Sequence, residues 1–257
     1  MKKRGVKMRE QELHIFLHIP KTGGSTLNSI FTRQFSAQEL YDHELFQNKI
    51  IPLADLTSED KNQIHAIAGH LLYGAHEQFT KPYHYFTMLR HPVDRVLSLY
   101  SYLKNYPGYE RLQNMSLEEY VRTEPEAQNG QTLLLCGTPI QYDVSLAKQR
   151  LETFDVVGIT ERFDESLYLL KSVFGWTEIH YEKVNITKTK LKRADVPLET
   201  IKLIEEYNKL DLELYQFAKE LLQKRLTNLP NREKKAMKSF VQKQKSMNKQ
   251  SKNAKLN

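Results

Sequence analysis

The sequence has little cysteine and no long apolar run, and both absences exclude classes of protein. Its 257 residues include one cysteine, Cys136, so the chain forms no internal disulfide and does not depend on an oxidising compartment. The start of the chain is basic but lacks the apolar stretch of a signal peptide, and no later segment is long enough to span a bilayer. We therefore expect a cytoplasmic protein without a membrane anchor.

The body of the chain also lacks a net positive charge. The net charge is +7, but residues 231–257 contribute +8 and residues 1–12 contribute +3, which leaves −4 for residues 13–230. A basic groove for nucleic acid is therefore not indicated. The C-terminal segment is rich in Lys, Gln, Asn and Ser, a composition that favours a solvated, disordered tail. Contact of this tail with an anionic polymer or a membrane surface is the alternative.

Short apolar runs alternate with amphipathic segments, which is typical of an α/β domain with a parallel sheet. We predict strands in 14–19, 64–69, 83–90 and 154–160, each followed by a more polar or helical segment. Pro92 suits the first position of a helix, and Pro197 opens a long helical pattern that is broken near Asn208. The predicted fold is a three-layer α/β/α arrangement around a central parallel sheet.

The charge distribution and the apolar patterning divide the chain into three parts. We predict a basic N-terminal extension at 1–12, one folded domain at 13–225 and a basic, disordered tail at 226–257. The length suits one domain with tails better than two complete domains.

The segment "PKTGGST" after the first predicted strand indicates anion binding. It supplies Lys21, the glycine pair Gly23 and Gly24, and several hydroxyl groups. Glycines allow backbone N–H groups to approach a ligand closely, and the N-terminus of the following helix favours negative charge. A turn that only joins a strand to a helix needs one glycine at most. The loop is therefore predicted to be P-loop-like, with phosphate or sulfate as its ligand.

The order of residues differs from that of the nucleotide-triphosphate P-loop. That motif places its lysine after the glycines and is followed by Ser or Thr, whereas Lys21 precedes Gly23 and Gly24 here. No apolar strand ends in an aspartate suited to hold magnesium. A nucleotide kinase-like phosphotransferase stays open as an alternative function.

A second strand-to-helix junction offers another anion site. Arg90 ends a predicted strand, and Ser98 lies in the next helix. At about 1.5 Å per residue, Ser98 lies roughly 9 Å along the helix from Pro92, within reach of a phosphate against the helix flank. The two sites together suggest a nucleotide with two separated anionic groups.

The pair of motifs resembles the carbohydrate sulfotransferases, in particular the branch that includes heparan sulfate 2-O-sulfotransferase and many bacterial proteins. In that family a segment like "IPKTGGST" holds the 5′-phosphosulfate of 3′-phosphoadenosine 5′-phosphosulfate (PAPS). A segment like "LRHPVDRVLSLY" holds its 3′-phosphate. The resemblance covers most of residues 14–222 and implies transfer of a sulfuryl group from PAPS to a hydroxyl of a glycan or glycolipid. A PAPS-binding protein without turnover is a further alternative.

The resemblance also implies roles for individual residues. "AGHLLYGAHE" is similar to the Gly-His segment of the family, which makes His70 the expected base. His76 is the second candidate, as a substrate contact or an alternative base, and Glu77 is the third. Lys21 is expected to stabilise the leaving phosphate, so no metal is needed. Arg95 is expected to be a structural ion-pair partner. The expected PAPS ligands are Lys21, Thr22, Gly23, Gly24, Ser25, Thr26, Arg90 and Ser98, together with Thr187 and Lys190 in a loop that closes over the nucleotide.

Two positions depart from the family pattern. Ala68 stands where heparan sulfate 2-O-sulfotransferase has a second histidine, two positions before the base. Leu133 stands where many relatives have arginine. Contacts made by those side chains are therefore not carried over to this chain.

Overall fold

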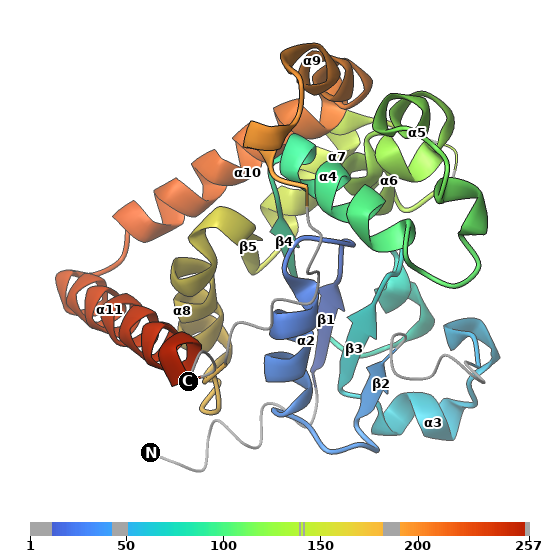
Figure 1. Ribbon diagram of the computed structural model, residues 1–257. Helices are drawn as coiled ribbons and strands as arrows, with labels where there is room; N and C mark the ends of the chain where they lie inside the picture. Colours follow the sequence, from blue (N-terminus) through green and yellow to red (C-terminus); the bar gives the residue numbers. More distant parts are fainter. Residues whose placement is uncertain (1–11, 43–50, 139, 141, 182–190, 255–257) are drawn as a thin grey trace, which may run out of the picture.

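The computed structural model describes residues 12–42, 51–138, 140, 142–181 and 191–254. In this part of the chain, five parallel strands form one sheet in the order β2-β3-β1-β4-β5 (Figure 1). The strands are β1 (Leu13–Leu17), β2 (Leu40–Asp42), β3 (Ala66–Gly69), β4 (Tyr83–Leu89) and β5 (Val156–Ile159).

Helices surround the sheet and form the other layers. They are α2 (Gly24–Thr32), α3 (Ser58–Gln63), α4 (Pro92–Leu103), α5 (Leu117–Thr123), α6 (Gly130–Cys136), α7 (Val144–Thr153), α8 (Phe163–Phe174), α9 (Leu198–Tyr207), α10 (Lys209–Thr227) and α11 (Asn231–Ala254). The predicted α/β/α fold with a parallel sheet is confirmed. Pro92 begins α4, and the predicted break at Asn208 separates α9 from α10. Helices α6 and α7 were not predicted from the sequence.

Aromatic side chains fill the space between the sheet and its covering helices. On one face, Phe16 of β1 stacks on Phe86 of β4 at 5.0 Å between ring centroids, and Phe31 of α2 packs against both. On the other face, Tyr85 stacks on Phe154 at 4.9 Å and on Tyr73 at 5.0 Å. Burial of such large apolar surfaces dominates the stability of a core and fixes the helices on the sheet.

The parallel register places the functional segments at one edge. Leu17 at the end of β1 pairs with Gly69 of β3 on one side and with Thr87 of β4 on the other. The carboxyl ends of the three strands therefore meet, and ligands of open parallel sheets bind outside these ends.

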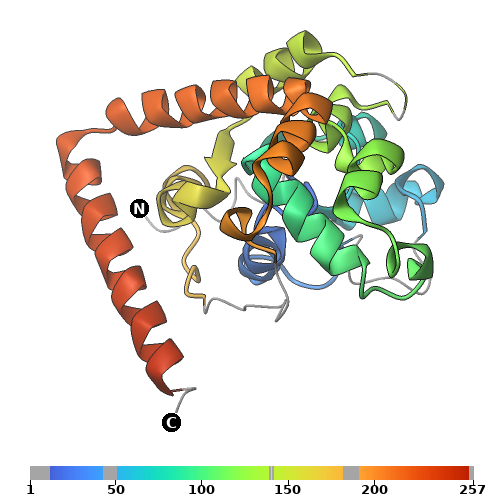
Figure 2. The ribbon, with the colours of Figure 1, turned by 45° about the horizontal axis from the view of Figure 1, so that its top comes forward.

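The structure corrects the prediction that the C-terminal segment is disordered, because Asn231–Ala254 form helix α11. Met237 is buried, the Phe240 ring lies 5.9 Å from that of Tyr168 in α8, and Gln244 donates to the Tyr181 carbonyl at 2.9 Å. These residues recur at intervals of three and four, so they share one side of the helix. Charged neighbours obscured this sparse pattern in the sequence. Figure 2 shows α11 meeting α10 at a sharp angle.

Candidate active site

The candidate site lies where β1, β3 and β4 end. The loop that holds Lys21 follows β1, His70 follows β3, and Arg90 follows β4. The guanidinium of Arg90 donates from Nη1 to the carbonyl oxygen of Lys21 at 3.0 Å, which ties the two predicted anion sites together. The predicted placement of these three residues at one edge therefore agrees with the structure.

The loop between β1 and α2 has the backbone form of an anion receptor. Lys21 and Gly23 have positive φ angles of 68° and 85°, and α2 begins at Gly24 with neither a side-chain cap nor an acidic residue in its first turn. A helix N-terminus without its own cap directs N–H groups and positive potential to a ligand. Ser25 is exposed and Thr26 is half-buried, so neither hydroxyl residue is enclosed in the core.

Thr22 has a different position from the other hydroxyl residues of the loop. Its side chain is fully buried, and its Oγ1 donates to the carbonyl oxygen of Ile19 at 2.8 Å. The hydroxyl therefore stabilises the loop, which leaves only the backbone of Thr22 for a ligand. Thr160 stabilises the same turn, with its Oγ1 2.5 Å from the Thr22 carbonyl oxygen and 3.0 Å from that of Leu89.

Position 24 must be glycine because the side chain of His18 leaves no room for a Cβ atom. A Cβ atom at this position would lie 1.6 Å from Nε2 of His18, a separation that no packing tolerates without movement. The second glycine of the loop thus serves to seat a buried imidazole under the start of α2.

His18 was missed by the sequence analysis, although it stands two residues before the loop. The register Leu17–Gly69, extended by one residue, places His18 beside His70, and their ring centroids are 4.5 Å apart. The His18 N–H donates to the Gly69 carbonyl oxygen at 3.1 Å. The sequence does place a histidine close before the glycines, in "HIPKTGG". His18 was instead assigned to the apolar strand 14–19, with no role at the site.

The environment of His18 favours its neutral form. Burial lowers the pKa of His18 well below its ordinary value, and the charges of His70 and Lys21 lower it further. His18 therefore offers an uncharged imidazole between two candidate catalytic groups. His70 itself is exposed at the strand end.

The side chain of Lys21 contacts helix α4. Its Nζ lies 3.9 Å from the centre of the Tyr102 ring, a cation–π distance. The ring of Tyr102, in the last turn of α4, thus contacts the ammonium without neutralising its charge.

Arg90 is positioned by a residue that the sequence analysis did not select. The amide side chain of Gln131 accepts from the Arg90 N–H and donates to the Arg90 carbonyl, both at 3.0 Å. Gln131 is completely buried at the start of α6. The sequence shows Gln131 as a polar residue before the apolar run of "NGQTLLLCG". Its pairing with Arg90 could not be predicted, because the two residues meet only in the folded protein.

Ser98 and Arg95 occupy different environments on α4. Ser98 is mostly buried on the helix. Arg95 is almost completely buried, with Nε 3.8 Å from Oδ2 of Asp211 and Nη2 3.2 Å from the Glu126 carbonyl oxygen. The prediction that Arg95 is a structural ion-pair partner is confirmed.

His76 and Glu77 do not join this cluster. They lie in a short 3-10 helix, Ala75–Gln78, where Nδ1 of His76 is 3.0 Å from the Tyr85 hydroxyl and its ring centroid is 4.1 Å from that of Tyr83. Tyr83 begins β4, so this contact is near the amino end of the strand, whereas the candidate site is at the carboxyl end. The structure thus places both residues away from Lys21, His70 and Arg90, and their contact with the acceptor stays a prediction. Thr187 and Lys190 lie outside the described residues.

Comparison with known proteins identifies the family. A model described as "Sulfotransferase family" matches residues 4–218. The chain belongs to the sulfotransferase family. The apolar strand, the glycine loop and the Arg90 junction described above all fall within the matched region.

Curated relatives carry the names of carbohydrate sulfotransferases. Human galactose-3-O-sulfotransferase 3 is 27% identical over an alignment of 232 positions, and the match covers 78% of this chain and 54% of the relative. Mouse heparan-sulfate 6-O-sulfotransferase 3 is 24% identical over an alignment of 281 positions, and the match covers 85% of this chain and 59% of the relative. The chain thus spans just over half the length of these relatives.

Among solved structures, a mouse sulfotransferase, SULT7A1, complexed with PAP is 12% identical, with a TM-score of 0.32, and the match covers 91% of this chain and 84% of that one. Within the described residues of our chain, no helix has both the length and the apolar character needed to cross a membrane.

Proposed function

We propose that the protein transfers the sulfuryl group of PAPS to a hydroxyl group of a glycan or glycolipid acceptor. The observation that carries this proposal is the meeting of Lys21, His70 and Arg90 at the end of three parallel strands, next to the uncapped start of α2. The names of the relatives, which specify galactose and heparan sulfate, support a carbohydrate acceptor.

The residues present fit a donor with anionic groups at two ends. The loop of residues 20–26 supplies backbone N–H groups and hydroxyls for the phosphosulfate, and Lys21 supplies a cation. Arg90 and Ser98 supply donors for a 3′-phosphate, because a guanidinium binds phosphate oxygens in a bidentate manner. Bound PAPS supplies the sulfuryl group, whose bond to the phosphate oxygen breaks as its bond to the acceptor oxygen forms.

His70 is proposed as the general base. Its imidazole accepts the proton of the acceptor hydroxyl, which a neutral histidine does efficiently near neutral pH. His18 lies beside it, at 4.5 Å between ring centroids, and orients the ring. Lys21 stabilises the negative charge that grows on the departing phosphate, a role that requires a preorganised cation and no metal.

Gln131 and Thr160 act through other residues. Gln131 fixes the backbone of Arg90, and Thr160 bridges the loop and the end of β4. They hold the two anion sites at a constant separation.

We propose a further, weaker contact of the exposed lysines of α11 with an anionic surface, since their side of the helix faces solvent.

Transfer of radiolabelled sulfate from PAPS to a glycan extract tests the proposal. We expect the wild type to transfer sulfate and His70→Ala to lose this activity. Binding of the nucleotide product, adenosine 3′,5′-bisphosphate (PAP, called the bisphosphate below), should be nearly unchanged in this variant. A wild type that binds the bisphosphate but labels no acceptor would instead favour a binding protein without turnover. Stronger stabilisation by ATP with magnesium than by the bisphosphate would favour a phosphotransferase.

A further inference from the structure

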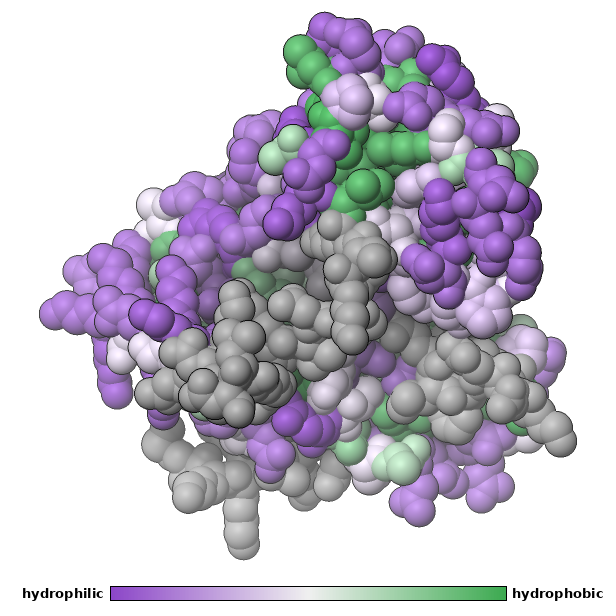
Figure 3. Space-filling model, in the orientation of Figure 1, coloured by the Kyte–Doolittle hydropathy of each residue, from purple (hydrophilic) through white to green (hydrophobic). Residues whose placement is uncertain are grey.

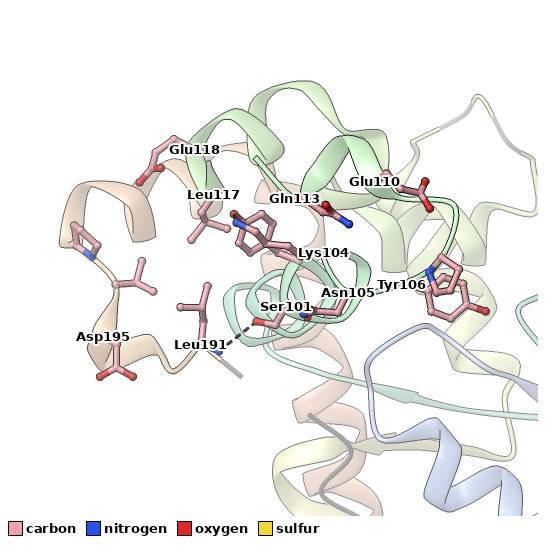
Figure 4. Close-up of a pocket in the computed structure, with 14 residues that line it drawn as sticks. Ser101, Lys104, Asn105, Tyr106, Glu110, Gln113, Leu117, Glu118, Leu191 and Asp195 are labelled. Atoms are coloured by element: carbon pink, nitrogen blue, oxygen red, sulfur yellow. Dashed lines mark hydrogen bonds between the residues drawn. The ribbon is translucent and has the colours of Figure 1, made fainter. Parts of the chain in front are cut away.

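A hollow of about 1000 Å³ lies between the second half of α4, α5 and the segment before α9. Figure 4 shows the side chains that line it on these three elements, with Leu117 and Leu191 towards its middle and Tyr106 and Asp195 at its margin. Figure 3 shows a hydrophobic area on the same upper face with hydrophilic residues around it. A space of this size accommodates a ligand larger than a single small metabolite. The proposed donor site does not use it.

A short chain of rings connects the hollow to the candidate catalytic lysine. Lys21 Nζ lies 3.9 Å from the centre of the Tyr102 ring, and the Tyr102 and Tyr106 ring centroids are 5.1 Å apart, so Tyr106 lies within about 9 Å of Nζ. Tyr106 also lines the hollow. A ligand that extends from the reaction centre therefore reaches the hollow by passing one aromatic side chain.

The walls combine aromatic and amide groups. Tyr106 provides a half-buried ring, and Asn105 and Gln113 provide exposed amides, whereas the ring of Tyr100 is buried. Leu117, Leu191 and Val196 add apolar side chains. The Asn105 amide donates from Nδ2 to the Ser101 carbonyl at 3.1 Å, which fixes its orientation and leaves its oxygen to accept a hydrogen bond. Rings that contact the C–H faces of a sugar, beside amides that bind its hydroxyls, match the amphipathic surface of a carbohydrate.

The charges of the lining residues select against an anion. Three carboxylates line the hollow, those of Glu110, Glu118 and Asp195, against one ammonium, that of Lys104. Nζ of Lys104 is 3.1 Å from the Tyr100 hydroxyl. A hydrogen bond from the Thr200 hydroxyl lowers the pKa of Glu118, and one from the Gly108 N–H lowers the pKa of Glu110, so both are ionised at neutral pH.

We propose that this hollow is the acceptor subsite and that it binds uncharged sugar residues, not sulfated or carboxylated ones. The inference rests on the proposed sulfotransferase function and adds the charge class of the acceptor. Carboxylates accept hydrogen bonds from sugar hydroxyls, whereas they repel sulfate and uronate groups.

The test compares two acceptor probes, N-acetyllactosamine, which is uncharged, and heparan sulfate, which is polyanionic. Saturation-transfer NMR with the full chain and the bisphosphate product measures binding of each probe, and labelled PAPS measures transfer. We expect the wild type to bind and sulfate N-acetyllactosamine, and Tyr106→Ala to lower its acceptor kcat/KM at least tenfold. Tyr142→Ala is the matched control, because Tyr142 is exposed and does not line the hollow.

A second variant tests the charge argument. We expect the double change Glu110→Gln and Asp195→Asn to raise binding of heparan sulfate at least threefold and to leave bisphosphate binding unchanged. Preference of the wild type for heparan sulfate would overturn the inference, as would equal effects of Tyr106→Ala and Tyr142→Ala. If the wild type fails to bind the bisphosphate at all, the proposed function fails; intact bisphosphate binding without a Tyr106 effect refutes only the subsite.

Discussion

The two strand-to-helix junctions at the sheet edge differ in how they present themselves to an anion. After β1, helix α2 starts at Gly24 without a side-chain cap, so its backbone is open to a ligand. After β4, the N–H groups of Arg90 and His91 are already bound to Gln131 and Glu161 at 3.0 Å each. The first junction thus offers backbone N–H groups to a ligand. The second offers side chains, because hydrogen bonds within the protein already occupy its backbone N–H groups. Substitutions should therefore act on conformation at the first junction and on individual contacts at the second.

The largest effect is expected at Gly24, where the added Cβ of Gly24→Ala collides with His18. Overpacking of this kind costs about 3 kcal/mol of unfolding free energy. Chemical denaturation measures this loss, and bisphosphate binding should fall with it. Ser29→Ala, at an exposed position of α2, is the control. Unchanged stability and binding in Gly24→Ala would show that the first junction is not a rigid receptor.

Lys21→Gln should reduce transfer more than binding. Loss of one preorganised charge at the leaving group lowers kcat by about 10²- to 10³-fold. Steady-state kinetics with labelled PAPS measures this change, with Lys219→Gln as a control on the exposed side of α10. A Lys21 variant with normal kcat and a raised KM would make the lysine a simple binding residue.

Ser98→Ala should act on a single contact at the second junction. Removal of one hydrogen bond to a charged phosphate weakens binding of 3′,5′-bisphosphate about tenfold. Binding of ADP, which lacks the 3′-phosphate, should not change. Equal losses for both nucleotides, measured by calorimetry, would place Ser98 elsewhere on the ligand.

Two histidines should give the fold opposite pH dependences. The pKa of His18 is lowered by burial, so the unfolded chain binds its proton more readily and stability falls as the pH drops below about 6.5, by at most about 1.4 kcal/mol per pH unit. The pKa of His84 is raised by its hydrogen bond to Asp155, so it stabilises the fold as the pH falls. Melting temperatures between pH 5 and 7 should therefore become less pH-dependent in His18→Gln and more so in His84→Gln. The same slope in both variants would contradict these assignments.

Local signals predicted much of the molecule. Apolar runs and helix-starting residues such as Pro92 placed most strands and their helices, because these features depend on nearby sequence. The anion loop was predictable for the same reason, since glycines, hydroxyls and a lysine at a strand end have few other uses together. The position of Arg95 followed from its spacing on a helix.

Other features depend on contacts between distant segments. Gln131 meets Arg90 only because α6 packs against the end of β4, and His18 meets His70 only through the register of two strands. The helix at the C-terminus was missed because its docking side has few apolar residues among many lysines. His76 was placed at the site by its nearness to His70 in sequence, yet the chain turns it towards the tyrosines at the other end of β4.

Calorimetric titration of the wild type with 3′,5′-bisphosphate and with ADP, without magnesium, tests the central claim most directly. Two charge-assisted contacts from Arg90 and Ser98 predict that the bisphosphate binds about 100-fold more tightly than ADP. Arg90→Gln should remove most of this preference. Equal affinities for the two nucleotides, or tighter binding of ATP with magnesium, would contradict the assignment of this sheet edge to PAPS.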